Sequence, residues 1–268
     1  MVQNLKLFYY RRADGQLNFG DDLSPIITSY VSGRPIEWSP PNTAELIGLG
    51  SILHLTKENL LSTLLPWSNS KEKMVWGAGI ISGDVRKNDI FRKLNYLSVR
   101  GPLTRDLLGL PKDITMGDPG LIVGEIFPRR MPKHDVGVVL HYSHKSRRSE
   151  ILEAWPFLGA RFIDVEDDAE SVVASIAECR SILSSSLHGL VVADALGIPN
   201  MKLPMQTGVI GGDFKYRDYF GSIGRDFIEF SGRDDLEFLL ESGWGQYQEN
   251  IDRSISDQKR VLNRALKK

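Results

Sequence analysis

The chain has 268 residues, of which 41% are hydrophobic and 25% are charged, values that are typical of a globular protein and not of a disordered one. Its 33 Lys and Arg residues are balanced by 34 Asp and Glu residues, so the overall charge provides no positive field that would hold nucleic acid or an anionic membrane. The single cysteine, Cys179, excludes an internal disulfide framework and a metal site built from several thiolates, and it favours a reducing compartment.

The first segment of the chain does not predict secretion or membrane insertion. Residues 1–12 contain a short apolar segment followed by charge, which predicts a buried strand rather than a signal peptide. No apolar run in the sequence approaches the roughly 20 residues that a membrane helix needs. We therefore expect a cytoplasmic protein without a transmembrane segment, which could still work at the inner face of a membrane on a substrate held there.

Short apolar runs alternate with helix-length amphipathic segments, which predicts an α/β fold with parallel sheets covered by helices. In the first half, strands are expected at residues 5–10, 44–55, 73–80, 95–101 and 113–120. Several of them end in glycine, and such folds bind ligands beyond the carboxyl ends of their parallel strands. The glycines of "GLGSIL" and "GAGI" do not complete GxGxxG, so NAD binding is not predicted.

Polar residues follow the first of these strands. Residues 16–25 offer Asn18, Asp21 and Asp22 beside the expected ligand cleft, and Ser24 is expected to cap a helix that begins at Pro25. A simple turn with a helix cap is the alternative interpretation. It would account for Asp22 and Ser24, but less well for the two acidic residues and the asparagine together.

Two further strand ends carry charged candidates. Arg100 ends an apolar strand, so its guanidinium is expected to point into the mouth of the cleft and hold a carboxylate or a phosphate. Asp118 occupies a similar position before a proline and a helix. It would either orient Arg100 or cap that helix, and the sequence leaves both roles open.

The second half repeats the alternation after a break. Residues 125–135 are rich in proline and charge and predict a linker, which divides the chain into domains of residues 1–128 and 129–268. Strands are then expected at residues 135–144, 160–167, 181–186 and 200–205, and helices at residues 147–159, 169–180 and 187–197. Apolar residues at helical spacing from Ile251 to Leu266 predict a long helix that crosses back to the first domain.

The stretch "SSSLHG" joins a predicted strand to a helix that begins at about Leu187 and His188. The hydroxyl groups of Ser184, Ser185 and Ser186, together with the free N–H groups of the helix terminus, would bind an anion. A dry apolar environment is unfavourable for a histidine with such polar neighbours, so a functional role for His188 is favoured over core packing.

Other basic side chains have weaker contexts. His141 ends a strand on the same rim as His188, where it would bind substrate or cap the edge. Lys215 follows a glycine-rich loop and would either reach an anion at the serine–histidine turn or remain a solvated surface charge. His54, His134 and His144 have no comparable context, and the histidine spacing predicts no metal site.

In this order, "NFGDDLSP", "LGSILH", "VWGAGI", "SVRGPLTRDLL", "GDPGLI", "SSSLHGLVVADALGIP" and "FKYRDYF" resemble the polysaccharide pyruvyltransferase family over residues 16–220. Within that family, the chain looks most similar to bacterial enzymes that place pyruvate ketals on exopolysaccharide repeat units. The resemblance implies two Rossmann-like domains that face a cleft, as in the GT-B glycosyltransferases. The first domain would lie on the acceptor side and contribute Arg100, and the second would lie on the donor side.

The resemblance also implies the substrates. Phosphoenolpyruvate would be the donor, with no further cofactor, and a sugar hydroxyl pair would be the acceptor, on a glycan that could be a lipid-linked oligosaccharide. Arg100 and His188 would belong to the donor site. Many family members carry an arginine two residues before this histidine, where the present chain has Ser186, so Lys215 or the helix terminus would supply the second contact to the anion.

The resemblance leads to a hypothesis about the chemistry. His188 would act as general acid toward the methylene carbon of the donor, since histidine titrates near neutral pH. A helix N-terminus disfavours imidazolium, so the bound donor would have to restore it. The alternatives are a GT-B glycosyltransferase that uses a nucleotide sugar, and a non-catalytic glycan-binding protein on the same fold.

Overall fold

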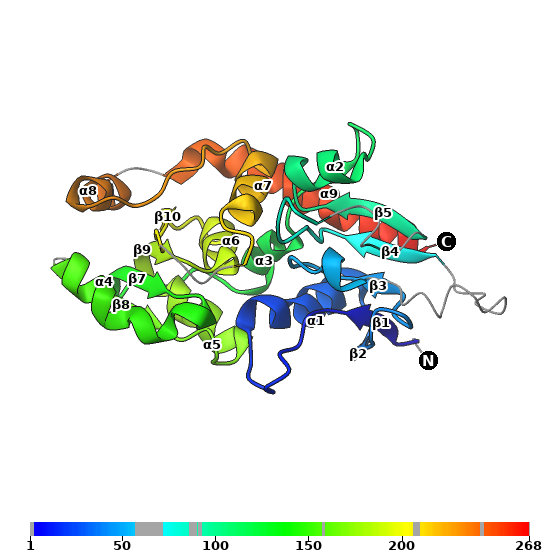
Figure 1. Cartoon of the computed structure of the whole chain (residues 1–268), viewed down its shortest axis with the longest axis horizontal. Coiled ribbons are helices and arrows are strands. Elements are labelled where there is room, and N and C mark those ends of the chain that lie inside the picture. Colours follow the sequence, from blue (N-terminus) through cyan, green and yellow to red (C-terminus); the bar gives the residue numbers. More distant parts are fainter. Residues whose placement is uncertain are drawn as a thin grey trace.

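A computed structural model describes residues 3–56, 72–85, 90, 93–156, 159–205, 210–241 and 244–267. The chain forms two parallel sheets that lie at opposite ends of the molecule, with α1, α6 and α7 between them (Figure 1). The predicted α/β fold with parallel sheets is confirmed. No helix in the described part of the chain has both the length and the apolar character needed to cross a bilayer.

The first sheet has the strand order β2-β1-β3-β4-β5-β6, and each neighbouring pair is parallel. Its strands are β1 (Leu5–Phe8), β2 (Ile36–Trp38), β3 (Leu46–Ile47), β4 (Lys73–Trp76), β5 (Leu94–Val99) and β6 (Thr115–Met116). The strands predicted at residues 44–55 and 113–120 are shorter than expected, because each strand is followed by a loop and then by a 3-10 helix, at Leu53–Thr56 and Pro119–Ile122.

The second sheet has the order β10-β9-β7-β8, with β7 (His134–Val139), β8 (Arg161–Ile163), β9 (Cys179–Ser184) and β10 (Asn200–Lys202). In the centre, Val138 pairs with Phe162 of β8 and Leu183 of β9. The last four residues of β7 are all buried, as expected for a parallel strand with both faces covered.

The described residues also form α-helices. They are α1 (Phe19–Ser32), α2 (Pro102–Leu108), α3 (Val123–Ile126), α4 (Arg148–Ala154), α5 (Ala169–Ala177), α6 (Leu187–Ala195), α7 (Phe214–Ser222), α8 (Arg233–Glu241) and α9 (Gln248–Leu266). Short 3-10 helices are η1 (Leu53–Thr56), η3 (Pro119–Ile122), η4 (Tyr142–Arg147) and η6 (Trp244–Tyr247). Within the helix predicted at residues 147–159, residues 157 and 158 lie outside the described part of the chain.

Helix α1 begins earlier than the sequence pattern predicted. Its N-cap is Asn18, and Ser24 and Pro25 lie inside the helix rather than at its start. The reason is an apolar stripe in which Phe19, Leu23 and Ile27 follow one another at helical spacing and are all fully buried. Burial of this stripe outweighs the loss of one backbone hydrogen bond at the proline.

The two sheets share one apolar core. A single cluster contains Phe19 and Leu23 of α1 together with Val139, Ile163 and Val173 of the second half. The predicted linker is shorter than residues 125–135, because α3 includes its first two residues and β7 its last two. The segment between them, residues 127–133, contains no helix or strand.

Helix α9 packs across the first sheet, beside β5 and β6 (Figure 1). The side chain of Gln258 accepts a hydrogen bond from the hydroxyl of Ser98 at 2.7 Å and donates one to the carbonyl oxygen of Gly117 at 3.0 Å. The indole N–H of Trp76 donates to the backbone carbonyl of Gln258 at 3.0 Å. A C-terminal element therefore stabilises the N-terminal sheet.

Both sheets reverse their strand order at an internal point. In the first sheet the reversal lies between β1 and β3, and in the second it lies between β7 and β9. Loops diverge at such a point, so the crevice beyond the carboxyl ends of these strands is the usual ligand site of doubly wound folds. A ligand site is therefore expected at the four loops that follow β1, β3, β7 and β9.

Candidate functional site

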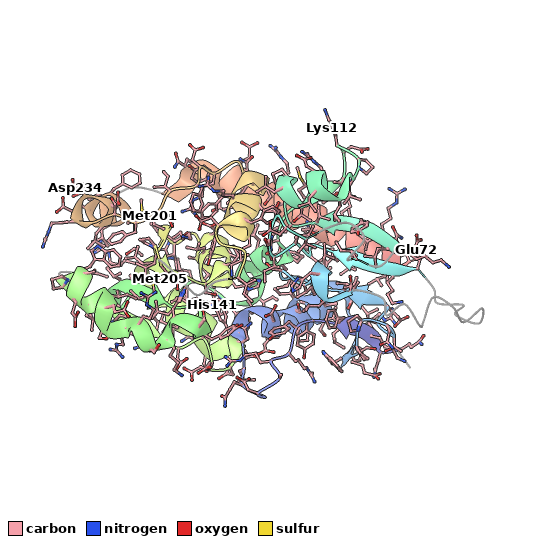
Figure 2. All side chains as sticks on the ribbon, in the orientation of Figure 1. Glu72, Lys112, His141, Met201, Met205 and Asp234 are labelled. Atoms are coloured by element: carbon pink, nitrogen blue, oxygen red, sulfur yellow. The ribbon has the colours of Figure 1, made fainter. Side chains whose placement is uncertain are left out.

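A pocket of about 300 Å³ lies where these four loops meet. From the first half it is lined by Tyr10, Asn18, Asp21, Ser51 and His54, among others. From the second half it is lined by His141, Tyr142, Ser186, His188 and Lys215. Figure 2 shows His141 at the junction of the two halves, while Glu72 lies at the far end of the first sheet.

Three ionisable side chains of this pocket are more than nine-tenths buried. The exposed fractions are 7% for Asp21, 9% for His188 and 7% for Lys215. Burial of a charge is costly unless a partner compensates it, yet the described residues leave each of these groups with hydrogen-bonding capacity to spare. Such a cluster is typical of a site that receives a ligand.

His188 is the second residue of α6 and packs against α1. A Cβ atom at Gly20 would overlap its imidazole ring, so the absence of a side chain at Gly20 makes room for it. Its Nε2 atom is buried and has no hydrogen-bond partner among the described residues. Burial, with the charges of Lys215 and Arg100, lowers the pKa of His188 to about 3, so the imidazole of the ligand-free site is neutral at pH 7.

Asp21 lies in the first turn of α1. Its Oδ2 accepts a hydrogen bond from the side-chain amide of Asn18, and its Oδ1 faces Gly50, where a Cβ atom would lie 2.7 Å away. Burial and the neighbouring charge of Asp22 raise the pKa of Asp21 to about 7, against the opposing effect of Lys215. This carboxyl group can therefore carry a proton near neutral pH.

Lys215 enters the pocket from α7. Its Nζ lies 5.1 Å from the centre of the Tyr216 ring, and no carboxylate in the described ranges forms an ion pair with it. Lys202, by contrast, is paired with both Asp213 and Glu229. Burial and the charge of Arg100 lower the pKa of Lys215 to about 8. An anionic ligand would supply the negative charge that Lys215 lacks.

The three serines of the β9–α6 turn have different environments. The Oγ of Ser184 lies 2.9 Å from the carbonyl oxygen of Val139 and accepts the N–H of Ser186 at 3.0 Å. The Oγ of Ser185 accepts the backbone N–H of His141 at 3.0 Å. The structure thus places Ser184 and Ser185 in the support of the loop, and Ser186, the N-cap of α6, in the pocket wall.

Two histidines follow β7. His141 lines the pocket, caps η4 by accepting the N–H of Ser143 and has its pKa lowered to about 3, chiefly by burial and by Lys215. His144 is buried, and its Nδ1 lies 3.0 Å from the Oγ of Ser185. The capping role and the pocket position that the sequence left open for His141 therefore occur together.

Arg100 is fully buried rather than at the mouth of the pocket. Its Nε donates to Asp218 at 3.0 Å, one Nη donates to the Oγ of Ser51 at 2.5 Å, and the other donates to the carbonyl oxygen of Ile80 at 2.7 Å. Asp218 also accepts hydrogen bonds from the N–H and hydroxyl of Thr104. The guanidinium thus lies directly behind Ser51, which does line the pocket.

Two of the predicted acidic candidates act as caps. The carboxylate of Asp22 accepts the backbone N–H of Asn18 at 3.0 Å, and burial raises its pKa. The carboxylate of Asp118 caps η3 by accepting the N–H of Gly120 at 2.8 Å, and burial raises its pKa to about 6. Asp218, which the sequence did not single out, holds Arg100 in place of Asp118.

Several residues that line the pocket were not predicted from the sequence. His54 lies in η1, lines the pocket and has a buried Nδ1 without a partner among the described residues. Burial lowers the pKa of His54. Tyr10 and Tyr142 add aromatic rings to the wall. The only available signal was position, since each of the three follows a strand at one of the points where strand order reverses.

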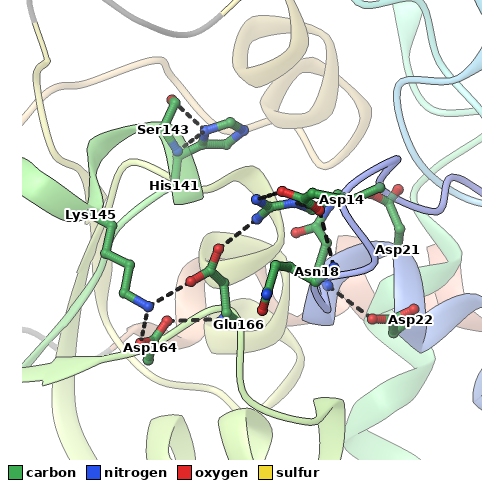
Figure 3. A network of polar contacts seen from close by, with 11 residues as sticks. Asp14, Asn18, Asp21, Asp22, His141, Ser143, Lys145, Asp164 and Glu166 are labelled. Carbon is green, nitrogen blue, oxygen red and sulfur yellow. Dashed lines mark hydrogen bonds and ion pairs between the residues drawn. The ribbon is translucent and has the colours of Figure 1, made fainter.

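A polar network joins the two halves beside the pocket (Figure 3). Arg12, from the loop after β1, pairs with Glu166 after β8 at 2.7 Å. Its guanidinium lies 4.3 Å from the centre of the Tyr142 ring. Glu166 also pairs with Lys145, which in turn pairs with Asp164 at 2.7 Å. We refer to Arg12, Glu166, Lys145 and Asp164 as the inter-sheet ion network.

Comparison with protein families and curated proteins gives three matches. A family model described as polysaccharide pyruvyl transferase matches residues 46–203. The chain is 26% identical over 226 residues to the succinoglycan biosynthesis protein ExoV of Rhizobium meliloti (strain 1021), which covers 82% of this chain and 65% of that protein. It is 30% identical over 167 residues to an uncharacterized protein of Acanthamoeba polyphaga mimivirus, at 59% and 57% coverage. The chain thus matches less than two thirds of each relative's length.

Solved structures show a weaker likeness. A functionally uncharacterized protein from Klebsiella pneumoniae aligns with a TM-score of 0.49 and 12% identity, over 85% of this chain and 93% of that chain. The E. coli heptosyltransferase WaaC with ADP-2-deoxy-2-fluoro heptose aligns with a TM-score of 0.33 and 12% identity, over 78% and 91%.

Proposed function

Because this chain belongs to the polysaccharide pyruvyl transferase family, we propose that it transfers pyruvate from phosphoenolpyruvate to a hydroxyl pair of a sugar in an exopolysaccharide repeat unit. Inorganic phosphate would leave and a ketal would form. The similarity to a succinoglycan biosynthesis protein supports a polysaccharide acceptor. A lipid-linked oligosaccharide at the inner face of a membrane is the form of acceptor that we propose to test first.

The proposal rests chiefly on the state of Lys215. This buried lysine has no ion-pair partner among the described residues, and it lines the pocket that lies where the strand order of each sheet reverses. Phosphoenolpyruvate has a phosphate and a carboxylate, so it needs fixed cationic and N–H donors. Lys215 supplies a cation, and Ser186 leads into the N-terminus of α6, whose free N–H groups favour an anion. Arg100 adds positive charge from behind Ser51.

The acceptor would enter from the side of the first sheet. Asn18 and Asp21 offer an amide and a carboxyl group to sugar hydroxyls, and the rings of Tyr10 and Tyr142 provide surfaces against which a sugar ring can pack. The pocket volume of about 300 Å³ lies at the small end of the range for ligand sites. That size suits a three-carbon donor beside the edge of a sugar better than a nucleotide sugar.

Thermal-shift measurements test the donor assignment. We expect phosphoenolpyruvate to raise the melting temperature of the protein, and UDP- and GDP-sugars to leave it unchanged. Lys215→Met should remove the effect of phosphoenolpyruvate, whereas Lys202→Met serves as a control for loss of a nearby lysine that already has protein partners. Stabilisation by a nucleotide sugar and not by phosphoenolpyruvate would instead favour a glycosyltransferase.

A further inference from the structure

We propose that Asp21, in its protonated form, delivers a proton to the methylene carbon of phosphoenolpyruvate, and that the neutral imidazole of His188 accepts the proton of the attacking sugar hydroxyl. This inference rests on the proposed function and reverses the role that the sequence suggested for His188. It makes Asp21 a catalytic residue rather than a binding residue alone.

The geometry places these two groups on one wall of the pocket. Asp21 directly follows Gly20, and the imidazole of His188 packs against Gly20 at the position where a side chain would be. Both residues line the same 300 Å³ pocket, together with Lys215. A donor held by Lys215 would therefore lie within reach of both.

Each of the two groups has an atom without a hydrogen-bond partner among the described residues. Asp21 binds Asn18 through Oδ2 alone, and Oδ1 accepts no hydrogen bond within the described part of the chain. The Nε2 atom of His188 is buried and likewise has no hydrogen-bond partner within the described part of the chain. A carboxyl group with a free oxygen and an imidazole with a free nitrogen are the groups expected for a proton donor and a proton acceptor.

Burial and the charges around the pocket shift the pKa values of Asp21 and His188 in opposite directions, as the roles of proton donor and proton acceptor require. Asp21 is faced by Asp22 on its own helix, by Lys215 from α7 and by Asp118 before η3, and its charge also reaches Tyr142 in η4. Burial raises its pKa to about 7, whereas burial with two cations lowers that of His188 to about 3. Titratable neighbours separated in this way identify the acid and the base of a site.

The bonds and protons balance with these assignments. Protonation of the methylene carbon by Asp21 makes C2 electrophilic, the first sugar oxygen bonds to C2, and its proton passes to Nε2 of His188. The second sugar oxygen then bonds to C2 as the C2–O bond to phosphate breaks, and its proton leaves with inorganic phosphate. Transfer of one proton from His188 to Asp21 through solvent restores the site.

Asp21→Asn provides the test, since asparagine resembles the neutral carboxylic acid but cannot donate a proton to carbon. We expect turnover, measured as phosphate release with a glycan acceptor, to fall by about 100-fold or more. The melting-temperature shift caused by phosphoenolpyruvate should persist. Asp135→Asn is the matched control, because Asp135 lies at the opposite end of β7 with a side chain that is 69% exposed.

A second readout does not depend on turnover. Binding of an anionic donor should raise the pKa of Asp21, so calorimetry at pH 7.5 in buffers of different ionisation enthalpy should detect proton uptake that is smaller in Asp21→Asn. Turnover of Asp21→Asn within threefold of the unaltered protein, or unchanged proton uptake, overturns the role of Asp21 while the proposed function stands. Absence of turnover in the unaltered protein with every glycan overturns both.

Discussion

At the scale of single residues, burial decides the charge of the site. The pocket holds a lysine whose pKa is lowered to about 8 and a histidine whose pKa is lowered to about 3, each first by loss of water and then by neighbouring cations. Removal of water disfavours the charged form of both. Lys215 stays protonated at neutral pH, whereas His188 does not, so only the lysine offers a full positive charge to an anion.

Donor binding should therefore depend on pH through Lys215. Its ammonium form exists below about pH 8 and is lost as the pH rises through that value, so the affinity for phosphoenolpyruvate should fall by about tenfold per pH unit above it. Titration calorimetry at a series of pH values measures this. In Lys215→Arg the positive charge persists to higher pH, so the decrease should disappear, and a decrease that remains would assign it to another group.

Gly20→Ala tests the packing of His188. The new methyl group would occupy the space of the imidazole, so we expect the ring to move and turnover to fall at least tenfold, with an unchanged circular dichroism spectrum. Gly232→Ala is the control, because no atom lies within 4 Å of the position of its Cβ. Equal turnover of the Gly20→Ala variant and the unaltered protein would mean that the position of His188 is unimportant.

The sequence predicted fewer than half of the described residues that line the pocket, and it did not predict the direction of their side chains. The strand ends identified Asn18, Asp21 and His188 because loops after parallel strands converge at one edge of a sheet. The same logic could not predict that Arg100 is buried, because its burial depends on Asp218, which is 118 residues away along the chain. Likewise, it could not assign Ser184 to the loop rather than the pocket.

At the scale of elements, long periodic segments were predicted best. Helix α9 appears where its apolar spacing placed it, and α6 begins at Leu187. Short elements were predicted less well, since β3 and β6 have two residues each and depend on neighbouring strands for their definition. The predicted start of α1 at Pro25 was wrong. Proline favours the first turn of a helix, but the burial of Phe19 makes the helix begin six residues earlier.

Helix α9 should contribute to stability through Gln258. Gln258→Ala removes the partners of the Ser98 hydroxyl and the Gly117 carbonyl, both in a buried environment, so the free energy of unfolding should fall by about 1–3 kcal/mol. Urea denaturation measures this change. Gln248→Ala, an exposed position of the same helix, should change it by less than about 0.5 kcal/mol, and an equal effect of both variants would contradict the account.

At the scale of the whole molecule, the two halves are joined by a shared core, by α9 and by the inter-sheet ion network. Because the pocket lies between the halves, its shape depends on how they are held together. The pairing of Arg12 with Glu166 is partly shielded from water, with 12% and 19% of the side chains exposed. Salt screens a pair in this environment less than it screens an ion pair on an open surface.

A double-mutant cycle of Arg12→Gln and Glu166→Gln measures that contribution. We expect a coupling free energy of about 0.5–3 kcal/mol between the two positions in urea denaturation. The pair Arg253 and Glu249, which is largely exposed on α9, provides a control with an expected coupling of about 0.5 kcal/mol or less. Equal coupling in both pairs would show that the network does not hold the halves together specifically.

We propose that the pocket between the two sheets transfers pyruvate from phosphoenolpyruvate to a sugar. Mass spectrometry of an exopolysaccharide repeat unit, incubated with the protein and phosphoenolpyruvate, measures this transfer. We expect a product whose mass increases by one pyruvyl ketal, with release of one phosphate, and no such product with His188→Gln or Lys215→Met. An unmodified glycan with phosphoenolpyruvate, together with a glycan extended by one sugar when a nucleotide sugar is supplied, would contradict it.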